Sequence, residues 1–271
     1  MSPLTNFWNL VQNENMKIYL RLRTWIMLGI IVLIPILLTV GLTLVTDDSD
    51  GNMWELMGTE TIIVFSLITI FTVVISAESV AGEFSAGTIK LLLIRPWSRS
   101  SILASKYVAL LLFSILQSIV CFAVTWAINA LVLGYTSDPG GIIPESSPME
   151  GHSIWAYMGV HYLYEWLQLV MVVSFAFMLS SAFRSSGLAI GLSIFLLFAG
   201  GTITGLLTLT DKAWVKYILF ANLDLTSYLD GRSPLPNMDM TLGFSLIMLA
   251  VYFIIFNAVS WTVFRKRDVA A

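Results

Sequence analysis

Charged residues are scarce in this sequence of 271 residues, of which 57% are apolar and only 11% are Asp, Glu, Lys or Arg. Soluble domains carry about 25% charged residues, so this composition excludes an ordinary soluble fold. Cysteine is almost absent as well: the single Cys121 excludes an intrachain disulfide. Its apolar neighbours in the sequence argue against a reactive thiol, because burial disfavours the thiolate.

The sequence also lacks the motifs of several common enzyme classes. It contains no P-loop, no paired zinc ligands in the spacing of a zinc site, and no Gly-x-Ser-x-Gly nucleophile elbow. We therefore expect that the chain is not an enzyme and that it holds no cofactor or metal of its own. A nucleic acid partner is not expected either.

Long uncharged runs are what the sequence has in abundance. A helix needs about 17–25 apolar residues to cross the hydrocarbon core of a bilayer, and outer-membrane barrels show short alternating segments instead. The runs therefore predict an all-α polytopic membrane protein with one transmembrane domain, residues 25–264, and a short tail, residues 265–271. The six predicted transmembrane helices cover about 25–45, 59–77, 105–133, 158–183, 187–209 and 242–264.

The distribution of charge predicts the orientation of these spans. If both termini lie on the same side, 11 of the 14 Lys and Arg residues fall in the segments on that side, and most acidic residues fall in the opposite loops. Because an excess of Lys and Arg marks the cytoplasmic side, we predict a multi-pass protein of the bacterial cytoplasmic membrane with both termini in the cytoplasm.

Residues 1–24 precede the first span and have a different pattern. Apolar residues recur there at near-helical spacing with polar residues between them, which predicts an amphipathic helix lying on the inner surface of the bilayer. The alternative is a frayed tail that is anchored by charge alone. The apolar positions are Phe7, Leu10, Val11, Ile18 and Leu22.

The loop between the fifth and sixth spans, about residues 211–239, is the longest and carries many apolar residues. A plain solvated loop would carry fewer. We therefore expect short re-entrant helices that dip into the outer leaflet, with protein covering their ends.

The fifth span contains two pairs of glycines in the small-xxx-small pattern that lets helices approach closely. We expect these glycines to pack against other helices of the same subunit, and the alternative is an interface between two subunits. They are Gly187, Gly191, Gly201 and Gly205.

His161 and Glu165 lie four residues apart, on one face of the fourth predicted span. Glu165 precedes Arg184 by 19 residues, or about 28 Å of helix, so it falls near the outer boundary if Arg184 marks the inner one. Aromatic residues surround it in the sequence, as in an interfacial belt. We favour solvation at this interface, and the alternative is a metal or proton site.

The uncharged runs on which the six predicted spans are based hold no Asp, Glu, His or Lys. An ion-coupled carrier would lack its relay in such spans, because ionisable residues within the membrane mark ion and proton pathways. This absence argues against a secondary transporter and implies that energy for any transport comes from elsewhere.

The segment between the second and third spans is polar, then basic. Gly87 can end one helical turn, and Thr88 can cap the next one. A short helix would follow Thr88, and Pro96 would terminate it. Ser98 through Ser101 offer caps for the third span. The segment therefore predicts a short helix across the inner mouth that could dock on a cytoplasmic partner, and the alternative is an ordinary basic loop.

These residues carry a resemblance. Ala81-Gly82-Glu83, Gly87-Thr88-Ile89, Arg95-Pro96-Trp97-Ser98-Arg99 and the later Lys106 resemble the pattern of permeases of type-2 ABC exporters. The resemblance covers nearly the whole chain through its layout of spans. It implies two cytoplasmic ABC ATPase subunits that hold ATP and Mg, and a second permease subunit, identical or paralogous, in the lipid bilayer.

The resemblance further implies that the loop is a coupling helix through which the ATPase acts on the spans. The apolar and aromatic residues on the facing spans indicate an amphipathic or lipophilic cargo, such as a drug, an antimicrobial peptide or a lipid. Two alternatives stay open: a secondary carrier or channel, and a membrane scaffold or sensor that transports nothing. The residues implied at the coupling contact are Glu78, Glu83, Gly87, Thr88, Lys90, Leu91, Arg95, Pro96 and Arg99.

Overall fold

The computed structural model describes residues 3–46, 51–89, 97–210, 212–235 and 238–266. Within these ranges every regular element is a helix and no strand occurs, which confirms the predicted all-α fold for the described part of the chain. The long helices are α1 (Pro3–Tyr19), α2 (Leu22–Thr46), α3 (Met53–Ser85), α5 (Arg99–Val132), α6 (Ile154–Ala182), α7 (Ser186–Thr208) and α8 (Leu242–Lys266).

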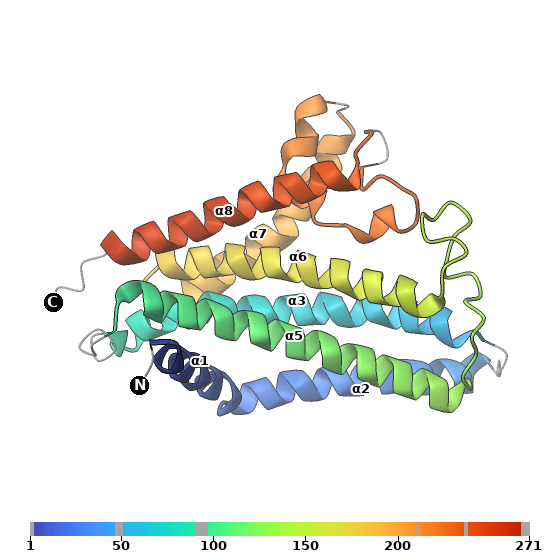
Figure 1. Cartoon of the computed structure of the whole chain (residues 1–271), viewed down its shortest axis with the longest axis horizontal. Coiled ribbons are helices and arrows are strands. Elements are labelled where there is room, and N and C mark those ends of the chain that lie inside the picture. Colours follow the sequence, from blue (N-terminus) through green and yellow to red (C-terminus); the bar gives the residue numbers. More distant parts are fainter. Residues whose placement is uncertain (1–2, 47–50, 90–96, 211, 236–237, 267–271) are drawn as a thin grey trace.

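Six of these helices, α2, α3, α5, α6, α7 and α8, are long and apolar enough to cross a membrane, as predicted. These helices run in alternating directions. At the end of the bundle where α1 lies, α2 and α5 start and α3 and α8 end (Figure 1). We call this the α1 end, and the end where α3 and α6 start the far end.

Side-chain caps fix where several helices begin. Ser98 accepts a hydrogen bond from the Ser101 amide at the start of α5, and Ser153 and Ser185 cap α6 and α7 in the same way. Each satisfies one of the amide groups that a helix N-terminus leaves without a carbonyl partner. The predicted cap within residues 98–101 is therefore confirmed at Ser98.

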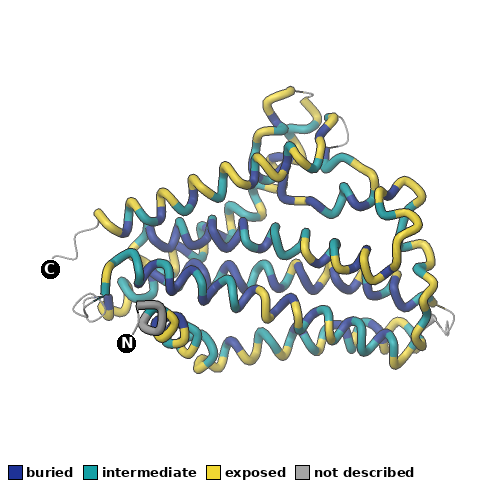
Figure 2. Tube along the Cα trace, in the orientation of Figure 1, coloured by how far each residue is buried: buried dark blue, intermediate teal, exposed yellow. Residues whose placement is uncertain are grey.

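The core lies along α3, α5 and α6, whose facing sides are buried, whereas α2, α7 and α8 expose much of their surface (Figure 2). Trp54, Phe65 and Tyr162 belong to the buried cluster toward the far end, and Tyr107 and Phe177 to the one toward the α1 end. Exposed aliphatic and aromatic side chains on the outer helices suit contact with lipid or with another membrane helix.

α3 extends well beyond the predicted span of 59–77, because it begins at Met53 and ends at Ser85. Asn52 caps its start by accepting a hydrogen bond from the Trp54 amide. Glu60, Glu78 and Glu83 lie within the helix, where other side chains bond their carboxylates. A search for uncharged runs ends each span at the first charge, so it could not see these paired groups. For the same reason α5 begins at Arg99, ahead of the predicted 105.

The remaining helices start and stop close to the predicted boundaries. α1 supplies the helix expected within residues 1–24, and its placement at a membrane surface stays a prediction. Between α7 and α8 lie three short 3₁₀ helices, η1 (Ala213–Tyr217), η2 (Leu219–Asn222) and η3 (Thr226–Tyr228). They occupy the loop in which we expected re-entrant helices, and their depth in the membrane also stays a prediction.

Candidate functional site

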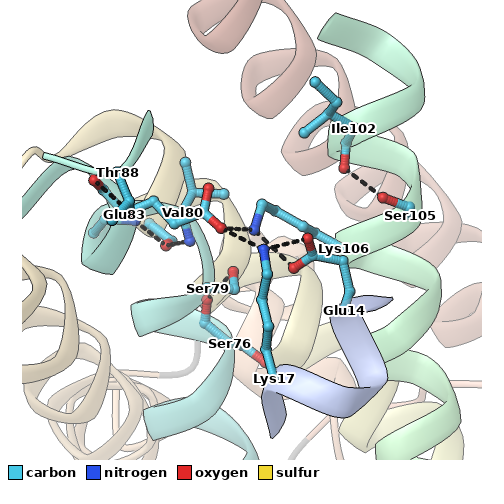
Figure 3. A network of polar contacts seen from close by, with 12 residues as sticks. Glu14, Lys17, Ser76, Ser79, Val80, Glu83, Thr88, Ile102, Ser105 and Lys106 are labelled. Atoms are coloured by element: carbon cyan, nitrogen blue, oxygen red, sulfur yellow. Dashed lines mark hydrogen bonds and ion pairs between the residues drawn. The ribbon is translucent and has the colours of Figure 1, made fainter. Parts of the chain in front are cut away.

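Four charged side chains from three helices meet at the α1 end. Glu14 and Lys17 come from α1, Glu83 from α3 and Lys106 from α5 (Figure 3). Lys106 Nζ lies 2.8 Å from Glu14 Oε2 and 2.6 Å from Glu83 Oε1. Lys17 Nζ lies 2.6 Å from Glu14 Oε1 and 2.9 Å from the same Glu83 oxygen. Each lysine thus bridges both carboxylates, and we call this set the ionic cluster.

The ionic cluster is largely shielded from solvent. The Lys106 side chain is 1% exposed, and those of Glu14 and Glu83 are 11% and 13% exposed. Two cations and two anions balance, which offsets part of the desolvation cost of burying them. Burial by itself would raise the pKa of Glu14, but Lys106 and then Lys17 outweigh it, and the pKa falls below its ordinary value. Burial would likewise lower the pKa of Lys17, yet the Glu83 and Glu14 carboxylates raise it.

A second group of ion pairs lies beside the ionic cluster, at the corner between α1 and α2. Glu78 of α3 accepts hydrogen bonds from Arg21 Nη1, at 2.6 Å, and from Arg23 Nη1 on its other oxygen. We call these three residues the arginine clamp. Its Arg21 side chain is 49% exposed, so this part of the clamp is weaker than the ionic cluster.

These contacts bracket the linker between α3 and α5. Glu83 lies two residues before the end of α3, and Lys106 lies two turns into α5. The charged groups therefore join α1 to the helix that enters the linker and to the helix that leaves it.

A cavity of about 440 Å³ lies among these residues, with apolar walls from Ile75 and Leu110. Two buried polar atoms at its edge, Glu83 Oε2 and Arg23 Nε, have no hydrogen-bond partner within the part of the chain that the structure describes. The α1 end therefore combines a neutralised ion network with a cavity beside it.

The structure places the residues expected at the coupling contact as follows. Glu78 and Glu83 belong to the arginine clamp and the ionic cluster. Gly87 and Thr88 are exposed beyond the end of α3, and Gly87 has the positive φ of 69° that favours glycine there. Arg99 donates from Nη1 to the Arg265 carbonyl at 3.0 Å. The remaining four, Lys90, Leu91, Arg95 and Pro96, lie outside the described residues.

Sequence reasoning missed three members of these networks. The sequence pattern predicts Glu14 and Lys17 only as polar residues of a surface helix, and Lys106 only as a basic residue at the start of a span. The available signals were a Glu and a Lys three residues apart on a helix, and a lysine at the edge of a long apolar run, where an unpaired charge is costly. Neither signal identifies the partner, since Lys106 and Glu14 are 92 residues apart in sequence.

His161 and Glu165 both lie on α6, within the far half of the bundle. The His161 ring stacks at 6.3 Å on Tyr157, and its Nδ1 is buried without a partner among the described residues. No group of three His, Cys, Asp or Glu side chains suited to a metal occurs in the described ranges. The metal interpretation of this pair therefore has no third ligand there.

The four glycines of α7 do not pack as we expected. A Cβ atom added to Gly187, Gly191, Gly201 or Gly205 would meet no atom within 4 Å in the described part of the chain. The prediction that these glycines pack within the subunit is therefore wrong for the described part of the chain, in which α7 contacts the bundle through other residues. The glycine of α7 that packs closely against another segment is Gly200, since a Cβ atom there would lie 2.1 Å from the Phe220 ring.

Comparison with known proteins places the chain among bacterial relatives. Residues 38–270 match the family described as "Protein of unknown function (DUF2705)". The chain is 43% identical over 210 residues to the uncharacterized protein YhcI of Bacillus subtilis (strain 168), an alignment that covers 76% of this chain and 66% of YhcI. The chain thus spans slightly less than two thirds of YhcI.

A second relative of the same organism is the uncharacterized membrane protein YdbK, 34% identical over 203 residues, or 75% of this chain and 78% of YdbK. Its description as a membrane protein agrees with the six long apolar helices found here. The chain is therefore a membrane protein.

Proposed function

Since the chain belongs to the DUF2705 family of proteins of unknown function, we propose from its own residues that it is the membrane permease subunit of an ATP-driven exporter. The α1 end faces the cytoplasm, and the linker between α3 and α5 receives the motion of a separate ATPase subunit. Two permease subunits pair in the membrane, and each engages one ATPase that holds ATP and Mg.

The observation that supports this proposal best is the ionic cluster. A linker that only connects two spans needs no buried charges, and burying ions is costly unless their geometry is good. Here Glu83 and Lys106, on either side of the linker, are bonded to each other and to α1. The three helices can then move as one rigid body when the linker is displaced.

The basic linker adds support from the sequence. Lys90 and Arg95 lie in it, after the Gly87-Thr88 pair that resembles exporter permeases, and Arg99 follows it at the start of α5. The orientation follows from the same charges, because Lys and Arg residues favour the cytoplasmic side. Apolar and aromatic side chains on the spans suit an amphipathic or lipophilic cargo.

Affinity purification from mild detergent tests the proposal directly. We expect the wild-type chain to carry an ATP-hydrolysing subunit with it, and a variant with residues 87–95 scrambled to lose that subunit. The Glu83→Gln variant should retain the ATPase but lower its stimulation by the permease, since the ionic cluster loses an anion. The matched control is Glu150→Gln, on an exposed turn. A wild-type chain that purifies intact without any ATPase would overturn the proposal in favour of a carrier or a scaffold.

The second permease subunit has a surface on α7 in this proposal. The four glycines lie open within the single chain, and small residues let two membrane helices approach closely. Gly191→Leu should therefore leave the folded subunit intact but shift a dimer toward monomer in crosslinking. Gly200→Leu is the matched comparison, because it clashes with Phe220 and should lower thermal stability instead. An unchanged dimer fraction in Gly191→Leu would remove α7 from the interface.

A further inference from the structure

A second buried carboxyl group lies on α3, toward the far end, and the proposed function does not use it. Glu60 is 0% exposed. Its Oε1 lies 2.5 Å from Thr39 Oγ1 of α2, within hydrogen-bond distance, and its Oε2 accepts a hydrogen bond from Asn129 Nδ2 of α5 at 2.6 Å. Both partners are also 0% exposed. The carboxyl group thus joins three membrane-spanning helices at a point that solvent does not reach.

No cation accompanies Glu60 among the described residues, in which every ion pair of a carboxylate with Lys or Arg lies at the α1 end. The basic residues of α2 and α5 lie toward the α1 end: Arg23 belongs to the arginine clamp, Lys106 to the ionic cluster, and Arg99 starts α5. Glu55, five residues before Glu60 on α3, is a further carboxyl group and not a cation.

The titratable groups that face this region are Cys121 of α5 and Tyr162 of α6, with Glu165 and His161 beyond them on α6. Cys121, Tyr162 and Glu165 are neutral or negative. The Nδ1 atom of His161 has no hydrogen-bond partner among the described residues, so His161 does not pair with Glu60 through it.

An unpaired buried carboxylate is strongly disfavoured in an apolar interior, and such a group takes up a proton instead. The hydrogen bonds identify where that proton resides. Asn129 Nδ2 uses its two hydrogens on Glu60 Oε2 and on the Thr125 carbonyl, which lies 2.8 Å away. Oε2 is therefore an acceptor. Oε1 faces the Thr39 hydroxyl, which can accept as well as donate, so the proton is on Oε1.

The contact between Thr39 and Glu60 lies where the buried face of α2 ends, toward the far end of the bundle. The buried residues of this half of α2 are Ile31, Pro35 and Thr39, one turn apart, and from residue 40 to 45 the helix has no buried residue. The bond between Thr39 and Glu60 is thus the last buried contact that holds α2 against α3 toward the far end. Pro35 lies within the helix one turn before it and removes a backbone hydrogen bond there.

We propose that Glu60 is a proton-binding site that controls the packing of α2. The neutral acid holds α2 through Thr39. When α2 moves away and water enters, the Oε1 proton passes to water, and the resulting carboxylate remains hydrated until α2 returns and the proton is taken up again. One proton is thus bound or released for each closure or opening of this contact.

Infrared spectroscopy of the purified chain tests the protonation state without any ATPase, so its result is independent of the proposed exporter function. We expect the carbonyl stretch of a protonated carboxylic acid at neutral pH, lost in Glu60→Gln and retained in the exposed control Glu150→Gln. Thr39→Val, which is nearly isosteric and so preserves the fold, should shift that band because it removes one hydrogen bond. Absence of an acid band in the wild-type chain, or a band unchanged in Thr39→Val and Glu60→Gln, would overturn the proposal.

A distance measurement tests the link to α2. Spin labels on Leu44→Cys of α2 and Leu131→Cys of α5 occupy exposed positions toward the far end, and the native Cys121 is buried from the label. As pH is raised, the wild-type distance should lengthen or broaden, whereas Glu60→Gln, which mimics the protonated acid, should keep one pH-independent distance. A wild-type distance that does not respond to pH would refute the control of α2 by this proton.

Discussion

Two carboxyl groups on α3, Glu60 and Glu83, are buried by opposite means. They are 23 residues apart in sequence, or roughly 35 Å of helix. Glu83 is surrounded by cations, since Lys17 and Lys106 both bond its Oε1. Glu60 has only neutral hydrogen-bond partners among the described residues, Thr39 and Asn129. One end of the same helix thus holds a charge with partners, and the other holds a carboxyl group that burial favours as a neutral acid.

The difference shows what each end can do. An ion network with several cross-bonds resists rearrangement, because breaking any member leaves another charge uncompensated. Such a network suits a rigid connection between helices. A single neutral acid needs only one proton to change its charge, so it suits a contact that opens and closes. Four predictions test this contrast, beginning with the largest expected effect.

Lys106→Met should destabilise the chain most. It removes the central cation of the ionic cluster and leaves two carboxylates to the partly exposed Lys17, at an expected loss of about 3–5 kcal/mol. Thermal unfolding in detergent would measure this loss. The matched control is Lys266→Met at the exposed end of α8, which should change stability little. A loss below about 1 kcal/mol for Lys106→Met would show that the cluster is not a rigid connection.

Acid should weaken the same end of the bundle. The pKa of Glu14 is lowered below 4.5 in the folded chain, through Lys106 and Lys17 against the opposing effect of burial. Its contribution to stability is therefore fully present above 4.5 and is lost as pH falls through the folded value. We expect a smaller effect than in Lys106→Met, because Glu83 still pairs both lysines. Unfolding measured against pH should show a weaker acid dependence in Glu14→Gln than in the wild-type chain, and equal slopes would contradict the assignment.

Thr39→Val tests the neutral end. The variant removes one hydrogen bond to a buried carboxyl group, which in membrane proteins contributes about 0.6–1.7 kcal/mol. Thr43 is the matched control one turn later, because among the described residues its hydroxyl bonds only the Thr39 and Val40 carbonyls of its own helix. Thr39→Val should lower the unfolding temperature at neutral pH, and Thr43→Val should not. Equal effects of the two substitutions would mean that the Glu60 contact does not stabilise α2.

The six spanning helices and the Ser98 cap could be predicted from the sequence, since uncharged length and local capping are properties of neighbouring residues. The two carboxyl networks could not. The sequence pattern puts Glu60 and Lys106 at the starts of the second and third predicted spans, because charges mark the ends of uncharged runs. Their burial depends on Asn129 and Thr39 for Glu60, and on Glu14 and Glu83 for Lys106, which lie on other helices. The argument against an ionisable group within the spans was therefore wrong, while the role of the coupling residues stays a prediction.

Arg21→Gln should have the smallest effect and limits how far the rigid connection extends. Its guanidinium group is 49% exposed, and exposed ion pairs contribute about 0.2–1 kcal/mol. Glu78 also retains Arg23, the less exposed partner on its other oxygen. We therefore expect a loss near the lower limit for Arg21→Gln and a larger one for Arg23→Gln, both measured by thermal unfolding at low and high salt. If Arg21→Gln were as destabilising as Lys106→Met, the arginine clamp would belong to the same rigid network as the ionic cluster, and the rigid body would include the corner between α1 and α2.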